Sequence, residues 1–144
     1  MRIALFGTGN LATHFLNVFE RLEAISCVQW IGRHKNPPAV NTTPYFNSFQ
    51  NEIEVDICIL AISDDYIVEV AQSFNTDALV VHTAAARSLD ELAPHKRRGV
   101  LYPLQSFVKE LNINWENIPI CLESNDENDL CILEKLAQKL SDEV

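Results

Sequence analysis

The sequence predicts an α/β fold in which helices cover both faces of a doubly wound, mainly parallel sheet. Along the 144 residues, short apolar runs alternate with stretches in which apolar residues recur at helical spacing. This is the pattern of successive strand–helix–strand units. Several runs are continuously apolar, which is expected when both faces of a strand are buried. The first run leads into a turn with two glycines and then a helix. We therefore predict one three-layer domain over residues 1–144.

The continuous apolar runs predict the strands. The helices are predicted where apolar residues recur at helical spacing. Strands are expected at residues 3–6, 27–31, 56–62, 78–82, 99–102 and 118–122. Helices are expected at residues 10–22, 66–74, 88–93 and 127–140. The last helix carries Leu130, Leu133, Leu136 and Leu140 on one side, and this stripe is expected to pack against the same chain.

Polar residues predict where three of the helices begin. Asn10 is expected to cap the first helix, Asp64 or Asp65 the second, and Asp126 the last.

Residues 36–54 carry weaker signals. Pro37, Pro38 and Pro44 exclude a helix around them. Residues 45–46 suggest a short strand, and residues 47–51 suggest a loop or a short helix.

The turn after the first strand reads Gly7-Thr-Gly-Asn-Leu-Ala12. Gly7 allows a tight turn, Gly9 lets the backbone approach a pyrophosphate, and Ala12 lets the helix pack closely on the strand. Unpaired N–H groups and the positive end of the helix dipole then face the phosphates. The motif predicts a dinucleotide-binding turn; the alternative is an ordinary strand-to-helix turn that contains two glycines.

Basic residues follow the second predicted strand, where dinucleotide-binding folds select the ribose. Arg33, His34 and Lys35 stand there, and no carboxylate does. An acidic residue at this position binds the 2′-hydroxyl of NAD, whereas an arginine accommodates the 2′-phosphate of NADP. Arginine can bind a phosphate through two hydrogen bonds, and lysine adds a point charge. We therefore predict NADP(H) in preference to NAD(H); the alternative is a basic surface loop.

The second candidate ligand loop follows Leu60, near the end of the run at 56–62. Ala61, Ile62 and Ser63 leave room for the ribose and adenine of a ligand at the carboxyl end of a central strand. Asp64 and Asp65 come directly after them. Because adjacent side chains diverge, helix capping is favoured over paired acid–base catalysis for these two carboxylates.

His82 precedes Thr83 and Ala84 at the carboxyl end of another predicted strand. Small side chains here would let a flat ring lie close to the backbone. His82 could polarise a substrate carbonyl or hydrogen-bond a cofactor, but a structural bond to a neighbouring loop is the favoured interpretation. His14 and His95 are expected at the surface.

The segment Tyr-Pro-Leu-Gln-Ser-Phe at residues 102–107 follows the run at 99–102. It is interpreted either as a wall of a substrate cleft or as a buried turn with satisfied hydroxyls. Lys109 has the chemistry of a general acid, although a solvated lysine is the favoured interpretation. No catalytic residue is assigned from the sequence.

Composition and charge restrict the classes of partner. The chain is 47% hydrophobic and 22% charged, as in ordinary globular proteins, and it has no apolar run near the roughly eighteen residues of a membrane span. Its net charge is −9, which argues against a nucleic-acid partner. The N-terminus lacks a signal-peptide pattern, so we expect a cytoplasmic protein.

The cysteines show neither Cys-x-x-Cys spacing nor partner histidines. They are Cys27, Cys58, Cys121 and Cys131. We expect free thiols, with no metal site and no disulfide.

Residues 7–12 resemble the Gly-x-Gly-Asn-Met-Ala opening of pyrroline-5-carboxylate reductases and related NADP-dependent reductases. Three later segments, at residues 60–65, 82–85 and 102–107, resemble a bacterial family of unassigned activity more specifically. Members of that family join a Rossmann-like NADP-binding domain to a helical C-terminal domain. The resemblance covers residues 2–140 of this sequence and only the first domain, so a C-terminal helical domain is expected to be missing from the chain.

The resemblance implies a Rossmann-type fold and a set of residues that would hold NADP. Gly7, Thr8, Gly9, Asn10 and Leu11 would lie at the pyrophosphate, Arg33 at the 2′-phosphate, Ala61, Ile62 and Ser63 along the ribose, and Thr83 and Ala84 near the nicotinamide. In such reductases the C-terminal domain dimerises and completes the substrate site, which implies a homodimer through that domain.

Two positions depart from the family pattern. Residues 84–86 are alanines where relatives tend to have a glycine, which narrows the nicotinamide pocket. Tyr102 stands where relatives often have a histidine, which removes a candidate catalytic residue. The resemblance therefore supports cofactor binding better than turnover.

The leading hypothesis is the NADP(H)-binding domain of an oxidoreductase that transfers hydride to an imine or carbonyl of a small metabolite. One alternative is a non-catalytic dinucleotide sensor or interaction module, which the lack of a well-placed acid–base pair favours. Another is a methyltransferase that uses S-adenosylmethionine, for which Arg33 has the wrong charge.

Overall fold

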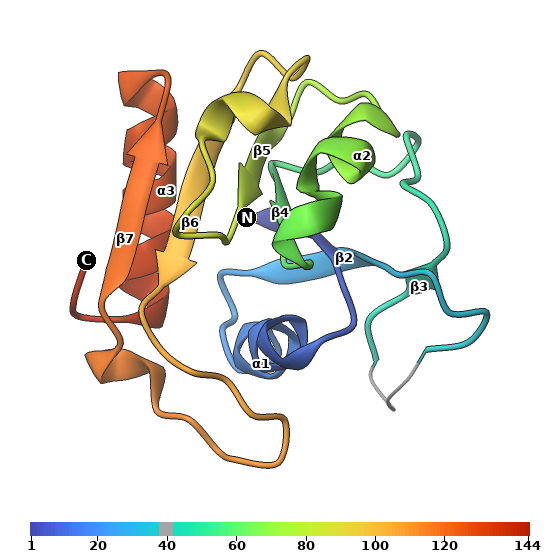
Figure 1. Ribbon diagram of the computed structural model, residues 1–144. Helices are drawn as coiled ribbons and strands as arrows, with labels where there is room; N and C mark the ends of the chain where they lie inside the picture. Colours follow the sequence, from blue (N-terminus) through green and yellow to red (C-terminus); the bar gives the residue numbers. More distant parts are fainter. Residues whose placement is uncertain (38–41) are drawn as a thin grey trace.

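The computed structural model describes residues 1–37 and 42–144, and in them it shows a seven-stranded sheet with helices on both faces (Figure 1). The strands are β1 (Arg2–Phe6), β2 (Ser26–Ile31), β3 (Tyr45–Phe46), β4 (Ile57–Leu60), β5 (Leu79–His82), β6 (Arg98–Pro103) and β7 (Ile120–Ser124). Their order in the sheet is β3-β2-β1-β4-β5-β6-β7. Neighbouring strands pair in parallel except β7, which is antiparallel to β6. The order reverses between β1 and β4, which confirms the predicted doubly wound, mainly parallel sheet.

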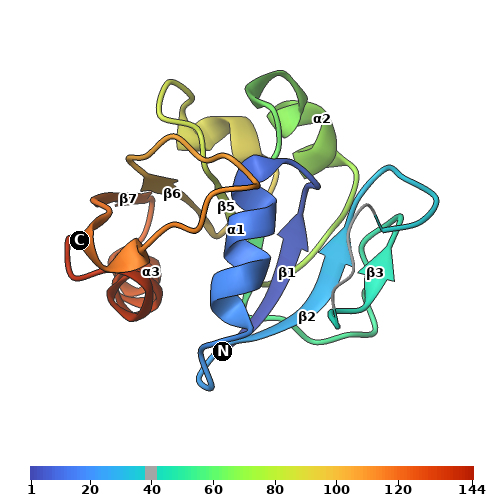
Figure 2. The same cartoon turned by 90° about the horizontal axis from the view of Figure 1, so that it is seen from below.

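Helices α1 (Asn10–Phe19) and α3 (Glu127–Leu140) cover one face of the sheet, and α2 (Ile67–Gln72) covers the other (Figure 2). Three short 3-10 turns complete the helical elements of the described residues: η1 (Asp64–Tyr66), η2 (Leu89–Leu92) and η3 (Trp115–Asn117). The terminal helix has the predicted limits. Its cap is also confirmed, because the Asp126 carboxylate accepts the backbone N–H groups of Asn128 and Asp129.

Three predicted helices are shorter in the structure. The helix predicted at 10–22 ends at Phe19, because the N–H of Arg21 and the N–H of Leu22 bond three residues back as the chain turns toward β2. The helix predicted at 88–93 is only the turn η2; Pro94 follows it and disfavours helical geometry at the preceding residue. The helix predicted at 66–74 is α2, preceded by η1.

Two predicted caps are wrong. Gly9 occupies the N-cap position of α1, and Asn10 is already helical. Neither Asp64 nor Asp65 caps α2, because both belong to η1, and Tyr66 stands at the N-cap of α2 without a side-chain bond.

Two predicted strands have a boundary that is wrong by two residues, and the limits of the other strands agree with the prediction within one residue. The strand predicted at 56–62 is β4 alone, because the chain leaves the ladder after Ala61, whose N–H still bonds the Phe6 carbonyl. The strand predicted at 118–122 begins two residues later, since the N–H of Ile118 closes the turn η3 on the Trp115 carbonyl.

The short strand expected at residues 45–46 is present as β3, and residues 47–51 form a loop. Pro38 lies outside the described residues. No helix in the described ranges is long and apolar enough to cross a membrane.

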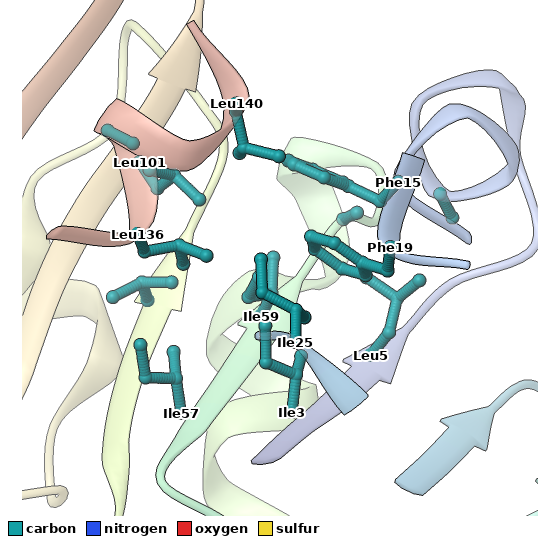
Figure 3. Close-up of a cluster of buried hydrophobic side chains, with 14 of the residues drawn as sticks. Ile3, Leu5, Phe15, Phe19, Ile25, Ile57, Ile59, Leu101, Leu136 and Leu140 are labelled. Carbon is teal, nitrogen blue, oxygen red and sulfur yellow. The ribbon is translucent and has the colours of Figure 1, made fainter. Parts of the chain in front are cut away.

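Alternate residues of the central strands belong to two apolar clusters, one on each face of the sheet. On the first face, Leu5 and Ile59 pack with Phe15 of α1 and with Leu136 and Leu140 of α3 (Figure 3). The other cluster joins Ala4, Phe6, Cys58, Leu60 and Val80 to Ile67 and Ala71 of α2 and to Leu92. Each fully buried aliphatic side chain contributes about 1.5–3 kcal/mol. Because Leu136 and Leu140 lie in the first cluster, the predicted packing of α3 against the same chain is confirmed.

Two histidines predicted at the surface are buried in the core. The His14 side chain donates from Nε2 to the Val108 carbonyl oxygen at 2.7 Å, and the residue is 4% exposed. His95 donates from Nε2 to the Ala71 carbonyl oxygen at 2.7 Å, and burial lowers the pKa of its imidazole. A neutral His95 imidazole that donates one bond needs no charge partner.

The four cysteines are free thiols, as expected. Burial raises the pKa of Cys58 and the pKa of Cys27 to about 12, so both thiols are protonated and unreactive near neutral pH. Among residues 1–37 and 42–144 no cluster of His, Cys, Asp or Glu could hold a metal ion.

Candidate functional site

The carboxyl ends of four neighbouring strands bring the predicted site residues to one edge of the sheet. Phe6 at the end of β1 pairs with Ile31 of β2 on one side and with Leu60 of β4 on the other, and Leu60 pairs with His82 of β5. The loops that follow these residues therefore emerge in a row, which we call the carboxyl edge. The row carries Gly7, Thr8, Gly9, Asn10, Leu11, Arg33, His34, Ala61, Ile62, Ser63, His82, Thr83 and Ala84.

Gly7 forms the tight turn out of β1 that the sequence predicts. Its φ angle is +119°, in the region that side chains rarely adopt, and a Cβ here would overlap the Ala61 carbonyl oxygen. The backbone of Gly7 is bonded on both sides: its N–H donates to the Ile31 carbonyl at 2.9 Å, and its carbonyl accepts Nε1–H of Trp30 at 2.7 Å. The turn is thus fixed by β2 as well as by β1.

Gly9 stands at the N-cap of α1 beside open space. A Cβ added at Gly9 would meet no atom within 4 Å, so the space above it is open. The cap position supplies no side-chain bond, and the first turn of α1 holds no acidic residue. The first N–H groups of α1 therefore have no partner within the helix or from a cap, and the positive end of the dipole is uncompensated. This is the geometry of an anion site.

Arg33 follows Gly32 directly after β2. Its guanidinium carbon lies 4.8 Å from the ring centre of Tyr66, which follows β4 in η1. This pairing spans β1, and the sequence analysis did not anticipate it because the two residues lie far apart in the chain. The Arg33 side chain is exposed, so it can also meet a ligand.

Gly32 allows the Arg33 loop to lie against the glycine turn. A Cβ on Gly32 would stand 2.6 Å from Cγ2 of Thr8 and 2.6 Å from the Tyr45 hydroxyl. The Tyr45 hydroxyl in turn donates to the His34 carbonyl at 2.9 Å. The backbone that carries Arg33 and His34 is thereby held next to Thr8.

The loops after β4 and β5 are tied to each other. Ala61 is buried and Ser63 is exposed, and the Thr83 hydroxyl donates to the Leu60 carbonyl oxygen, with 3.4 Å between the two oxygens. His82 is fully buried: its Nδ1 accepts the N–H of Ala84, and its Nε2 bonds the Ser88 carbonyl at 3.1 Å. Both ring nitrogens are thus engaged within the loop, in agreement with the favoured structural interpretation.

The segment at residues 102–107 contains both partly buried and exposed side chains. Tyr102 is half-buried on β6, and Gln105 and Ser106 are exposed beyond it. Lys109 is not simply solvated, because its ammonium donates to the Thr8 carbonyl oxygen at 3.0 Å. No local pattern could have indicated this contact, which joins residues 101 positions apart.

Comparisons with known proteins agree with this fold. No protein-family model matches the sequence, and no curated protein does. A Bacteroides fragilis protein that has been assigned as an NADP oxidoreductase matches with a TM-score of 0.83 and 25% identity, over 99% of this chain and 59% of that protein.

Two further solved structures are similar. Prephenate dehydrogenase from A. aeolicus, solved with NAD+ and hydroxyphenyl propionate, has a TM-score of 0.77, 14% identity and coverage of 98% of this chain and 57% of that one. Pyrroline-5-carboxylate reductase from Streptococcus pyogenes has a TM-score of 0.72, 18% identity and coverage of 100% and 57%. The predicted Rossmann fold and its resemblance to oxidoreductases of this type are confirmed, and the chain spans less than two thirds of each of these proteins.

Proposed function

We propose that this chain binds a nicotinamide dinucleotide at the carboxyl edge, with NADP(H) preferred over NAD(H), as the cofactor domain of an oxidoreductase. The glycine turn carries the proposal. It offers uncapped N–H groups at the start of α1, no acidic residue in the first turn and open space above Gly9, as a pyrophosphate requires. The matched oxidoreductases named with NADP and NAD+ support the same cofactor class.

The remaining loops suit the rest of a dinucleotide. Arg33 offers an exposed guanidinium for a 2′-phosphate, and Ala61, Ile62 and Ser63 would lie along the ribose. Thr83 and Ala84 would lie beside the nicotinamide. When bound, the nicotinamide supplies or accepts a hydride. The chain's own part is to hold the phosphates at α1, to orient the ring and to exclude water on that side.

The acceptor is proposed to be the imine or carbonyl carbon of a small metabolite. The matched proteins are longer than this chain, so we place the substrate site where a second domain would face the carboxyl edge. His82 adds no free acid–base nitrogen on this side. A proton donor for the reduced substrate would then come from outside the four loops.

The test is calorimetric titration of the chain with NADPH and with NADH. We expect NADPH to bind and NADH to bind more weakly. If neither nucleotide bound while the chain remained folded, the glycine turn would be only structural, and S-adenosylmethionine would be the next ligand to titrate.

Replacement of Arg33 by alanine is expected to remove the preference for NADPH. A hydrogen bond to a charged group contributes about 1.5–3 kcal/mol, so NADPH affinity should fall about tenfold or more while NADH affinity stays the same. Titration of Arg33→Ala with both nucleotides measures this. Arg21→Ala, an exposed arginine just beyond the end of α1, is the matched control. Equal losses for both nucleotides in Arg33→Ala would contradict a 2′-phosphate contact.

A non-catalytic dinucleotide sensor is the second candidate. The engagement of both ring nitrogens of His82 favours it, because no other histidine lies in the loops of the carboxyl edge except the exposed His34. A carbonyl or imine compound that the protein reduces at the expense of NADPH would exclude the sensor.

A further inference from the structure

Lys109 reaches the glycine turn from a segment that lies far along the chain. Its Nζ donates to the carbonyl oxygen of Thr8, the residue between the two glycines, at 3.0 Å. An ammonium has three donors, and the Thr8 carbonyl takes one. Among residues 1–37 and 42–144, none of the ion pairs involves Lys109. The Lys109 ammonium therefore lies at the glycine turn without a carboxylate paired to it.

The position of Lys109 is built into the fold. Residues 104–114, which we call the strap, run from β6 to η3 and pass beside the start of α1 (Figure 2). The buried His14 of α1 bonds the Val108 carbonyl next to Lys109 at 2.7 Å. The Phe107 ring packs on His14, with centres 5.3 Å apart, and on Trp115, with centres 5.4 Å apart. A core histidine and an aromatic cluster thus anchor the strap at the residues that precede Lys109.

Thr8 is contacted from two sides by elements that carry cations. Its side chain is packed so closely against Gly32 that a Cβ there would stand 2.6 Å from Cγ2 of Thr8, and Arg33 follows Gly32. Its carbonyl accepts the Lys109 ammonium. The elements that carry these two cations thus flank the glycine turn of a chain whose net charge is −9. A polyanionic ligand approaching such an acidic chain needs local cations to offset the repulsion.

We propose that Lys109 is a binding residue for the phosphates of the dinucleotide, with its free donors directed at the pyrophosphate held by the start of α1. The inference rests on the proposed function. Arg33 serves the ribose phosphate on the β2 side, and Lys109 serves the pyrophosphate on the strap side. A compact ammonium suits this role, because it acts as a point charge without a fixed hydrogen-bond geometry.

The experiment compares Lys109→Gln with Lys109→Arg and with Lys135→Gln. Lys135 is exposed on α3, so its substitution changes the net charge equally at a remote place. We expect Lys109→Gln to weaken NADPH binding about tenfold, whereas Lys109→Arg stays within about threefold and Lys135→Gln matches the wild type. The salt dependence of the NADPH dissociation constant should decrease in Lys109→Gln only.

A second ligand separates phosphate contact from a structural role. Adenosine 2′-monophosphate carries the phosphate assigned to Arg33 and lacks the pyrophosphate, so Lys109→Gln should bind it as the wild type does. Equal NADPH affinities in Lys109→Gln and Lys135→Gln, with wild-type binding intact, would overturn the role of Lys109 and leave the proposed function standing. Parallel loss of both ligands in Lys109→Gln would also overturn it, in favour of a strap that only supports the fold. Absence of NADPH binding in the wild type would overturn both proposals.

Discussion

Gly7→Ala is expected to destabilise the fold by roughly 3 kcal/mol or more, a large part of the stability of a domain of this size. Gly7 has a φ angle of +119°, which alanine adopts only with strain, and the added Cβ would overlap the carbonyl oxygen of Ala61. The turn cannot move aside to relieve the overlap, because Ile31 and Trp30 hold both backbone groups of Gly7. Equilibrium unfolding in urea measures the loss.

The control for Gly7→Ala is Gly9→Ala two residues later. Gly9 has φ −82° and open space around it, so the same methyl group should cost no more than about 1 kcal/mol there. Equal unfolding midpoints for Gly7→Ala and the wild type would show that the turn tolerates a side chain and that the strain argument is wrong.

Gly9→Asp is expected to act in opposite directions on stability and on binding. An aspartate at the N-cap of α1 should accept the free N–H groups and complement the helix dipole, so the free energy of unfolding should stay the same or rise by up to about 1 kcal/mol. The same carboxylate would occupy the proposed phosphate site and repel phosphates. Like charges brought together cost several kcal/mol, so NADPH affinity should fall by about a hundredfold or more.

Urea unfolding and calorimetric titration of the same preparation measure the two effects of Gly9→Asp. Asn17→Asp, an exposed position in the last turn of α1, adds the same charge away from the turn and should bind NADPH nearly as the wild type does. If Gly9→Asp still bound NADPH with wild-type affinity, the start of α1 would not be the phosphate site.

The parts of this fold that the sequence predicted correctly have short-range causes. The glycine turn rests on neighbouring residues, because Gly7 must take a positive φ wherever the strand turns so sharply into α1. The start of the terminal helix was predicted correctly because Asp126 bonds N–H groups only two and three residues away. Parallel strands could be predicted from continuous apolar runs because both faces of the sheet are covered.

The errors arise where distant residues decide the local structure. The sequence predicts His14 at the surface because it is a polar residue on a helix. In the structure it is buried, because the Val108 carbonyl, 94 residues away, accepts its hydrogen bond. Ala61 and Ile62 have strand-like neighbours, but the chain leaves the sheet there and enters η1. The contact of Lys109 with Thr8 depends on how the strap crosses α1, which no local pattern encodes.

The bonds of Gly7 have a consequence for the kinetics of ligand capture. Folding the sheet already orders the turn, because Ile31 and Trp30 fix its two polar backbone groups. Under the proposed function, an incoming phosphate group would meet a turn whose conformational entropy was already lost during folding. We therefore expect the association rate of NADPH to be set by diffusion and by the charges that its phosphates meet on approach, without a slow step at this turn.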